Sequence, residues 1–497
     1  MLPSSACPST SRRARSPPKR ASPVHPYTMH TLRGSSSTMR GALLPALRRA
    51  GQRQRAARRS PLSTLSSSDW QQQPELPPDD CVKFEDIVRA HHRIRSGVVR
   101  TECSPSHWLS QLTGCNLYFK KEQLQFTGSF KERGARNAIM SLDHEQRKAG
   151  VIAASAGNHA LALAWHGPQL DVPVTVVMPT VAPMTKVSNC RAFGANVIIR
   201  GAHIGEAKEW ALTGDPSLAS MTYINGYDDP EIIAGTGTIG IELLEQLPNV
   251  DAIVVPVGGG GLIAGIALAA KTLNPNVKVI GVEPRRCASY TAALEAGRPV
   301  AVSVLPTLAD GLAVPQVGSH AFAVARRWVD EVVVIDEKDV ALAVLRLVET
   351  QKMVVEGGGA TGLAALLPGG PLDRQDMKGK NVVVPLCGGN IDVNVLGRVI
   401  ERGLAADGRL VRLTIAVSDR PGGIAELTHI LAKEGASVKD IFHERAWLHS
   451  SVDQVTVKAV LETLGPEHNK DLLHTLAAAY PDATLKLEGT WCKDSLD

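Results

Sequence analysis

The sequence predicts an α/β protein in which a parallel-rich, helix-flanked sheet is followed by a small separate domain. Short runs of β-branched residues, apolar on both faces, alternate with helix-length segments along most of the chain. Such runs are typical of buried parallel strands joined by helical crossovers. Near residue 408 the pattern changes to strands in which apolar and polar residues alternate, as in half-buried strands. No run of about 18 apolar residues occurs, so no membrane span is expected.

The apolar runs define the expected parallel strands. In such sheets ligands bind beyond the carboxyl ends of the strands, so the loops after these strands are the expected place of any chemistry. The strands are predicted at residues 117–120, 151–154, 174–178, 196–200, 252–257, 277–283, 332–336 and 381–386.

The C-terminal residues 408–497 are predicted to form a βαββαβ unit, joined to the rest by a helical connection over 391–407. Gly435 closes its first amphipathic helix. Its strands are expected at 409–418, 437–447, 453–463 and 483–488, and its helices at 424–435 and about 467–479.

Residues 1–68 differ from the rest, because they contain 13 of the 54 Lys and Arg residues and no Asp or Glu. The remaining chain is mildly acidic, which argues against nucleic acid as its main partner. A Ser- and Arg-rich, acid-free leader predicts a disordered organelle transit peptide rather than a secretory signal. Residues 39–60 can form an Arg-rich amphipathic helix, which favours the mitochondrion over a plastid or the cytoplasm. A merely basic tail is the alternative.

The eight cysteines are scattered without a C-x-x-C pair, so neither a zinc site nor a disulfide framework is expected.

The first candidate motif is TGSFKERGARNAI at 127–139. Ser129 and Glu132 have the spacing of a capping box, which predicts a helix that begins there, with Lys131 in its first turn. A helix N-terminus and burial both lower a lysine pKa, so Lys131 could act as a Schiff-base nucleophile. A solvated lysine is the alternative.

The second motif, ASAGNHALALA at 154–164, directly follows a predicted strand. Ser155, Gly157 and Asn158 predict a tight turn into a helix whose free N–H groups suit a carboxylate. An ordinary helix cap, with His159 in the core or at the surface, is the alternative.

Two further motifs follow strands of the second series. Gly258, Gly259, Gly260 and Gly261 open an apolar helix, and their backbone N–H groups could surround a phosphate, although a plain tight turn is the alternative. Cys387 ends a strand before two glycines; by itself it reads as a buried structural thiol.

A lysine, a carboxylate-binding turn, a phosphate loop and a ring partner are together what pyridoxal 5′-phosphate requires. The stretches TGSFKERGARNA, ASAGNHA, IIAGTGTIGIEL, VVPVGGGGLIAGIA, GVEP and LCGGNID resemble the pyridoxal-phosphate enzymes of the tryptophan-synthase β-type fold (fold type II). Within that fold they are most similar to the threonine dehydratases, also called threonine ammonia-lyases. The C-terminal unit, with DRPGGIAEL, resembles an ACT regulatory domain.

This resemblance implies a two-lobed catalytic domain over 69–407, in which a smaller lobe of roughly 117–225 is inserted into the larger. Lys131 would hold the cofactor covalently and later act as the base at the substrate Cα. Phe130 would pack on the cofactor ring. The remaining roles implied are substrate binding by Ser155, Asn158 and His159, a ring-hydroxyl contact by Asn158, phosphate binding by Gly258, Gly259, Gly260 and Gly261, and a contact of Cys387 with the ring nitrogen.

The implied reaction is β-elimination of L-threonine to 2-oxobutanoate and ammonia, and also of L-serine to pyruvate. It serves isoleucine biosynthesis or threonine catabolism. A neutral thiol at Cys387 leaves the ring nitrogen largely unprotonated, which favours prompt loss of the β-hydroxyl over transamination. Serine racemase is an alternative, but Ala156 stands where racemases carry a second acid/base. A catalytically inactive amino-acid sensor is a further alternative.

The resemblance also bears on metal, effector and assembly. Glu283 matches a cation-binding carboxylate of some relatives, but Ser289 stands where its companion acid is expected, so no metal is assigned. Gly422 and Gly423 lie where ACT domains bind an amino-acid effector. Biosynthetic relatives often carry two ACT units, and one is expected here. Control by isoleucine is therefore left open. We expect a homodimer or homotetramer.

Overall fold

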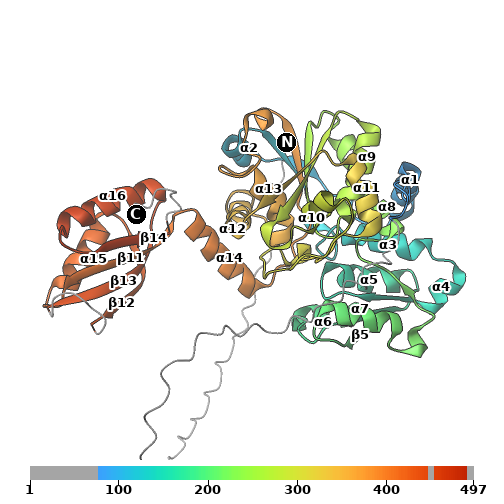
Figure 1. Ribbon diagram of the computed structural model, residues 1–497, viewed down its shortest axis with the longest axis horizontal. Coiled ribbons are helices and arrows are strands. Elements are labelled where there is room, and N and C mark those ends of the chain that lie inside the picture. The colour runs from blue at the N-terminus through green and yellow to red at the C-terminus, as the bar shows by residue number, and fades with distance from the viewer. Residues whose placement is uncertain (1–75, 446–452, 490–497) are drawn as a thin grey trace, which may run out of the picture. The chain divides into compact units, whose positions relative to one another are not determined.

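The computed structural model describes residues 76–445 and 453–489 (Figure 1). These residues belong to the second of two compact units, Gln73–Asp497, and the leader predicted at 1–68 lies outside the described residues. None of the described helices is long and apolar enough to cross a membrane.

The larger sheet has six strands in the order β1-β2-β10-β7-β8-β9, and all neighbours are parallel except β1 and β2. Its central strands are the β-branched runs of the sequence, buried on both faces, as parallel strands between helical layers must be. The strands are β1 (Cys103–Pro105), β2 (Asn116–Lys120), β7 (Ala252–Pro256), β8 (Lys278–Pro284), β9 (Glu331–Ile335) and β10 (Asn381–Pro385).

Successive residues of these strands enter two separate hydrophobic cores. Val383 of β10 packs with residues of α1 (Phe84–Ile94), α8 (Pro230–Gln246), α9 (Gly261–Leu273) and α11 (Ser319–Trp328). Its neighbours Val382 and Val384 pack on the other face. That face is covered by α2 (His107–Thr113), α12 (Glu337–Arg346) and α13 (Gly357–Leu366).

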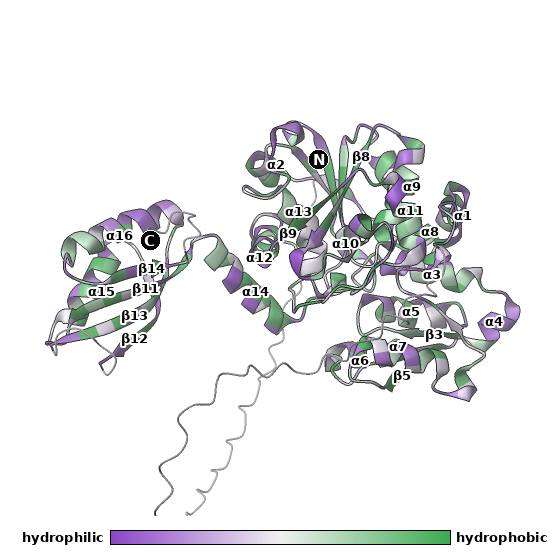
Figure 2. Cartoon of the chain, in the orientation of Figure 1, coloured by the Kyte–Doolittle hydropathy of each residue, from purple (hydrophilic) through white to green (hydrophobic). Residues whose placement is uncertain are grey.

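The smaller sheet is entirely parallel, in the order β5-β4-β3-β6. Its strands are β3 (Val151–Ala154), β4 (Val174–Met178), β5 (Asn196–Ile199) and β6 (Thr222–Tyr223). The helices between its strands are α5 (Asn158–Gln169), α6 (Met184–Ala192) and α7 (Ile204–Thr213), and α3 (Lys131–Ser141) and α4 (His144–Ala149) precede it. α4 has no buried residue and is mostly purple in Figure 2.

The smaller lobe was expected to begin near residue 117, and this boundary is wrong. β2 pairs in parallel with β10 and so belongs to the larger sheet. The strand pattern shows that β2 is buried but not which sheet it joins, because its partner lies 265 residues further along the chain.

The C-terminal residues form the predicted βαββαβ order, with a sheet arranged β12-β13-β11-β14 and antiparallel throughout. One face of this sheet carries a core of its own, which includes Leu427 and Leu472 from the two helices. Its elements are β11 (Leu410–Ser418), α15 (Gly423–Lys433), β12 (Ser437–Glu444), β13 (Gln454–Glu462), α16 (Pro466–Ala479) and β14 (Leu485–Glu488).

The remaining elements connect these parts. The helical connection expected over 391–407 is α14 (Val393–Ala406), and α10 is Ser289–Ala296. A π-helical turn covers Leu347–Gln351 and ends at Lys352, a non-glycine residue with a φ of 56°. Short 3-10 turns lie at Glu122–Leu124, Pro216–Leu218, Arg285–Cys287, Asp310–Leu312 and Gln375–Met377.

Candidate active site

Lys131 is the first residue of α3, as the sequence predicts. Its Nζ donates to the carbonyl oxygen of Gly226 at 2.5 Å and lies 5.0 Å from the centre of the Phe130 ring. Burial lowers the pKa of Lys131 to about 8, against the opposing influence of Cys387 and Glu356. A lysine with this pKa carries a substantial neutral fraction near physiological pH, as a nucleophile or base requires.

The capping box predicted at the start of α3 is wrong. The N-cap residue is Phe130 in a helical conformation, and the Ser129 hydroxyl is buried without a hydrogen-bond partner. Glu132 accepts instead from the backbone N–H of Thr127. Ser129 forms a β-bridge with Gly388, and the N–H of Phe130 donates to the carbonyl of Cys387 at 3.0 Å. The helix start is therefore positioned by the strand end of β10 and not by its own side chains.

A loop after β6, residues 225–228, links Lys131 to the glycine loop. The Gly226 carbonyl accepts from Lys131, and the ring of Tyr227 packs so closely that a Cβ on Gly259 would lie 2.2 Å from it. Asp228 accepts from the backbone N–H groups of Ser319, His320 and Ala321 at the start of α11. The sequence reasoning missed this loop, although its NGYDDP composition is a turn signal.

His159 lies beneath this loop and is 4% exposed. Its Nε2 lies 3.2 Å from the Ile224 carbonyl oxygen, and a Cβ on Gly226 would meet its ring at 2.7 Å. Burial, reinforced by the charge of Lys131, lowers the pKa of His159 to about 3. A neutral imidazole therefore packs against Gly226, whose carbonyl accepts from Lys131.

The turn between β3 and α5 is half-buried and faces the same region. The Gly157 N–H donates to the Ser155 hydroxyl at 3.3 Å, and Asn158 is the first residue of α5. A Cβ on Gly157 would meet no atom within 4 Å, so space adjoins the turn. Ser155 and Asn158 thus lie at a helix N-terminus beside open space, an arrangement that suits a bound anion.

Gly258, Gly259, Gly260 and Gly261 are buried and join β7 to α9. Gly260 has a φ of 91°, which favours glycine. A Cβ on Gly261 would lie 2.3 Å from the Tyr227 carbonyl oxygen. Within the described part of the chain, the N–H groups of Gly258, Gly259 and Gly260 have no backbone or side-chain acceptor. Unpaired buried N–H groups at a helix N-terminus form an anion site.

Cys387 follows β10, is 4% exposed and donates through its thiol to the Pro385 carbonyl at 3.3 Å. Burial raises its pKa well above the ordinary value, so the thiol stays neutral. The neighbouring Glu356, at the N-cap of α13, was not predicted. Its Oε1 accepts from the Asn158 side chain at 2.8 Å, and its N–H donates to the Gly388 carbonyl at 2.9 Å.

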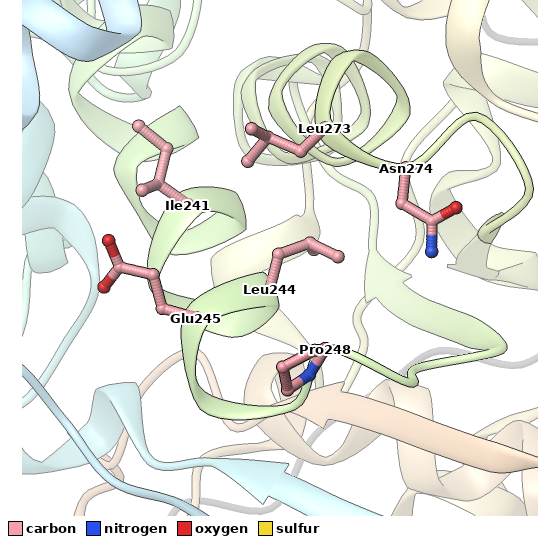
Figure 3. Close-up of a pocket in the computed structure, with 6 residues that line it drawn as sticks. All are labelled: Ile241, Leu244, Glu245, Pro248, Leu273 and Asn274. Atoms are coloured by element: carbon pink, nitrogen blue, oxygen red, sulfur yellow. The ribbon is translucent and has the colours of Figure 1, made fainter.

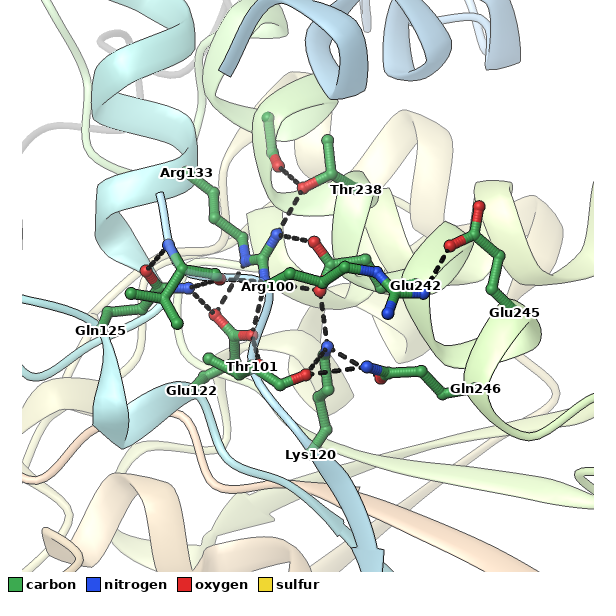
Figure 4. Close-up of polar contacts among 12 residues, drawn as sticks. Arg100, Thr101, Lys120, Glu122, Gln125, Arg133, Thr238, Glu242, Glu245 and Gln246 are labelled. Carbon is green, nitrogen blue, oxygen red and sulfur yellow. Dashed lines mark hydrogen bonds and ion pairs between the residues drawn. The ribbon is translucent and has the colours of Figure 1, made fainter. Parts of the chain in front are cut away.

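A buried network of ion pairs anchors α3 (Figure 4). Arg133, two residues after Lys131, donates to both Glu122 and Glu242 at 2.7–2.9 Å. Glu242 also accepts from Lys120 at 2.5 Å. These residues come from β2, the turn after it, α3 and α8, so the network ties the helix that carries Lys131 to the larger sheet.

Glu283 lies at the end of β8 and is fully buried. It accepts from the N–H groups of Tyr290 and Thr291 at 2.7 and 2.8 Å, and from the Thr291 hydroxyl. Its oxygens are thus used in holding the start of α10. Over the described ranges, 76–445 and 453–489, no group of three or more His, Cys, Asp or Glu residues could hold a metal.

A shallow hollow of about 420 Å³ lies away from these residues, at the C-terminal ends of α8 and α9 (Figure 3). It contains none of the predicted site residues. Its lining is Ile241, Leu244, Glu245, Pro248, Leu273 and Asn274.

The elements above bring Lys131, the turn of Ser155 and Asn158, the glycine loop and Cys387 to the carboxyl ends of strands from both sheets. Residues 94–388 match the family model described as "Pyridoxal-phosphate dependent enzyme", and the chain belongs to this family. The family predicted from the sequence is confirmed.

Comparison with individual proteins shows which members of this family the chain resembles. The chain is 43% identical to the L-threonine ammonia-lyase of Thermotoga maritima over 397 residues, which cover 80% of this chain and 98% of the relative. The processed threonine deaminase isoform 2 of Solanum lycopersicum is 35% identical, with a TM-score of 0.62, and covers 66% of this chain and 96% of its own. The serine racemase of Dictyostelium discoideum is 38% identical, with a TM-score of 0.59, over 63% and 100% of the two chains.

The residues present fit pyridoxal phosphate. The glycine loop offers N–H groups with no acceptor in the described chain, which suits the phosphate. Lys131 offers an amine of lowered pKa. The Ser129 hydroxyl and the His159 Nδ1 are buried polar atoms without a partner in the described chain, as expected around a polar ligand site.

Proposed function

We propose that the chain is an L-threonine ammonia-lyase, which converts L-threonine to 2-oxobutanoate and ammonia and L-serine to pyruvate. One observation carries the proposal. Lys131, with its lowered pKa, is joined through residues 225–228 to the glycine loop, in a chain 43% identical to an L-threonine ammonia-lyase over 98% of that protein.

We assign the following roles to the residues of the site. The N–H groups of Gly258 to Gly261 bind the phosphate, and Ser155 and Asn158 bind the substrate carboxylate at the start of α5. Pyridoxal phosphate, when bound, supplies an electron sink for the bond broken at the substrate Cα. Lys131 moves the Cα proton, because its pKa allows it to accept and return a proton near neutral pH.

Cys387 supports elimination through its lack of charge. Its raised thiol pKa means that it presents neither a carboxylate nor a cation to the ring nitrogen it is proposed to face. A neutral partner would leave that nitrogen largely unprotonated and so weaken the electron sink that the cofactor supplies, which would favour loss of the β-hydroxyl over transamination.

The test is release of 2-oxobutanoate from L-threonine by the full chain, with Lys131→Ala as the variant. We expect the variant to lose about 10²–10⁴-fold in activity and to lack the visible absorbance of lysine-bound cofactor, because it has no amine at this position. A folded, cofactor-loaded wild type that releases no oxo acid would contradict the proposal and favour the sensor alternative.

Serine racemase is the second candidate, because a serine racemase is among the structural neighbours. Ala156 argues against it, since a methyl group next to Ser155 cannot exchange a proton with the substrate. Chiral chromatography after incubation with L-serine discriminates between the two. Pyruvate without D-serine supports the lyase, and substantial D-serine supports the racemase.

Residues 408–497 are proposed to be an ACT regulatory domain that binds an amino acid near Gly422 and Gly423. The 397-residue match to the Thermotoga protein is too long to fit within 69–407, so it extends beyond the proposed catalytic domain. Gly422 has a φ of 106°, and a Cβ on Gly423 would lie 2.1 Å from the Ser418 carbonyl oxygen, so both positions favour glycine.

Regulation is tested with L-isoleucine, the end product of the biosynthetic pathway. Inhibition that is lost in Gly423→Val, a variant whose side chain cannot fit beside Ser418, would support a feedback-controlled enzyme. Inhibition retained in a folded Gly423→Val would place the effector elsewhere. We propose a homodimer or homotetramer, which light scattering would distinguish.

The leader, residues 1–68, is proposed to direct the chain to the mitochondrion. Its 13 basic residues and lack of acidic ones support this proposal. Fusion of residues 1–68 to a fluorescent protein would separate the mitochondrial address from the plastid and cytoplasmic alternatives.

A further inference from the structure

Glu356 is a buried carboxylate that the proposed mechanism does not use. It is 7% exposed and stands at the N-cap of α13, where its backbone N–H is held by the Gly388 carbonyl. Its Oε1 accepts from the Asn158 Nδ2 at 2.8 Å, and a Cβ on Gly388 would lie 2.4 Å from the same oxygen. The carboxylate therefore lies directly behind a residue proposed to touch the substrate and cofactor.

Asn158 is bound from its other side by Asn390. The Nδ2 of Asn390 donates to the Asn158 Oδ1 at 2.9 Å and to the Thr127 carbonyl at 2.7 Å. Because a backbone carbonyl can only accept, the Asn390 amide group must point its NH₂ at both oxygens. The side-chain oxygen of Asn158 is thereby identified, and its NH₂ must face Glu356.

Of the two N–H groups of the Asn158 amide, one is given to Glu356 and the other is unused, while the oxygen accepts from Asn390. The unused N–H makes Asn158 a hydrogen-bond donor toward a ligand. The ligand atom that meets this N–H must be an acceptor, as an anionic carboxylate or phenolic oxygen is.

We propose that Glu356 is a positioning residue that, with Asn390, fixes the amide of Asn158 so that it presents an N–H to an anionic oxygen of the bound ligand. The inference rests on the proposed function for the identity of that ligand.

Electrostatics agrees with this role. Burial, together with the carboxylate of Asp310, raises the pKa of Glu356 to about 7, whereas the bond from Asn158, Lys186 and the Asn390 N–H oppose the rise. Lys131 and Cys387 are the other titratable groups that feel its charge. Either protonation state of Glu356 keeps an oxygen that can accept from Asn158.

The test measures pyridoxal-phosphate binding to the apo full chain by absorbance titration, which does not depend on turnover. Glu356→Ala should weaken binding about tenfold and shift the visible band, since one held hydrogen bond is lost. Glu356→Gln keeps an acceptor and should stay within about threefold of wild type. Glu231→Ala is the matched control, because it removes a glutamate that accepts from the amide of Asn137 at 2.7 Å elsewhere in the fold.

A double-mutant cycle decides whether Glu356 acts through Asn158. In an Asn158→Ala background, Glu356→Ala should have no further effect on binding or on the band. Equal, independent losses in both backgrounds would overturn the proposal, and so would a Glu356→Gln variant as weak as Glu356→Ala. Thermal unfolding shows whether each apo variant folds. If Glu356→Ala does not fold, Asn390→Ala replaces it and should weaken cofactor binding in the same way. Wild type that binds cofactor but releases no oxo acid would contradict the proposed function and leave this test intact.

Discussion

At the scale of single residues, burial lowers the pKa of both bases in the site. Burial holds the pKa of Lys131 and of His159 below its ordinary value, and each side chain lies against a backbone carbonyl, that of Gly226 or of Ile224. Burial raises the pKa of the Cys387 thiol, because it disfavours the charged form of an acid as it does that of a base, and the thiol therefore stays neutral.

His159 should make the stability of the folded chain depend on pH. Its pKa falls from 6.5 to about 3 on folding, so the unfolded chain binds the extra proton between these values, and stability is lost as pH falls below 6.5. In urea unfolding, the stability advantage of wild type over His159→Leu should shrink by about 2 kcal/mol between pH 7 and pH 5. An advantage that stays constant or grows over this range would contradict the buried, neutral imidazole.

At the scale of elements, α3 is the helix on which the site depends, and two sets of contacts fix its first turn. The Phe130 N–H before it donates to the Cys387 carbonyl after β10, and Arg133, its third residue, is held between Glu122 and Glu242. The Arg133 and Glu122 side chains are fully buried and the Glu242 side chain is 4% exposed, so each charge depends on its partners.

Arg133→Ala should therefore destabilise the chain by about 3–5 kcal/mol, because it leaves Glu122 buried without its ion-pair partner and Glu242 with Lys120 alone. Arg100→Ala is the matched control, since Arg100 pairs with Glu245 across an exposed surface and should cost no more than about 1 kcal/mol. Both values come from chemical unfolding of the full chain. Equal losses for the two variants would show that the buried network adds nothing beyond a surface pair.

The elements of the fold were largely predictable because the parallel strands are continuous apolar runs. β3 and β4 have the predicted bounds, and the other six predicted parallel strands differ from the structure by about one residue. β1 and β6 were missed because three and two residues carry too little pattern to detect. The capping role predicted for Ser129 was wrong, because a spacing rule cannot show that the residues after β10 position the start of α3.

The candidate site was predictable where a motif follows a strand, and not where a distant element supplies the partner. Lys131, Ser155, Asn158, the glycine loop and Cys387 all follow local signals. Glu356 lies 198 residues from Asn158, so only the folded chain shows their contact. The EGGGA sequence that opens α13 is the one local signal that could have drawn attention to it.

At the scale of the whole described chain, the site is assembled from both sheets. Ser155 and Asn158 follow β3 of the smaller sheet, and the glycine loop and Cys387 follow β7 and β10 of the larger. The loop of residues 225–228, after β6, contacts Lys131, His159 of α5 and the glycine loop. Chemistry at Lys131 thus depends on the two sheets being held together, which Arg133 and its partners help to do.

The order of the larger sheet also affects how the chain is made. β10 lies between β2 and β7, although Asn381 at its start is 265 residues later than its partner Asn116 in β2. At typical rates of synthesis, β2 waits on the order of 10–50 s with the backbone N–H and C=O groups of one edge unpaired, whereas all strands of the smaller sheet have emerged by Tyr223. An unpaired strand edge is a template for aggregation. The chain therefore needs protection during translation until β10 arrives, and a defect in β10 would show first as a lower yield of folded protein.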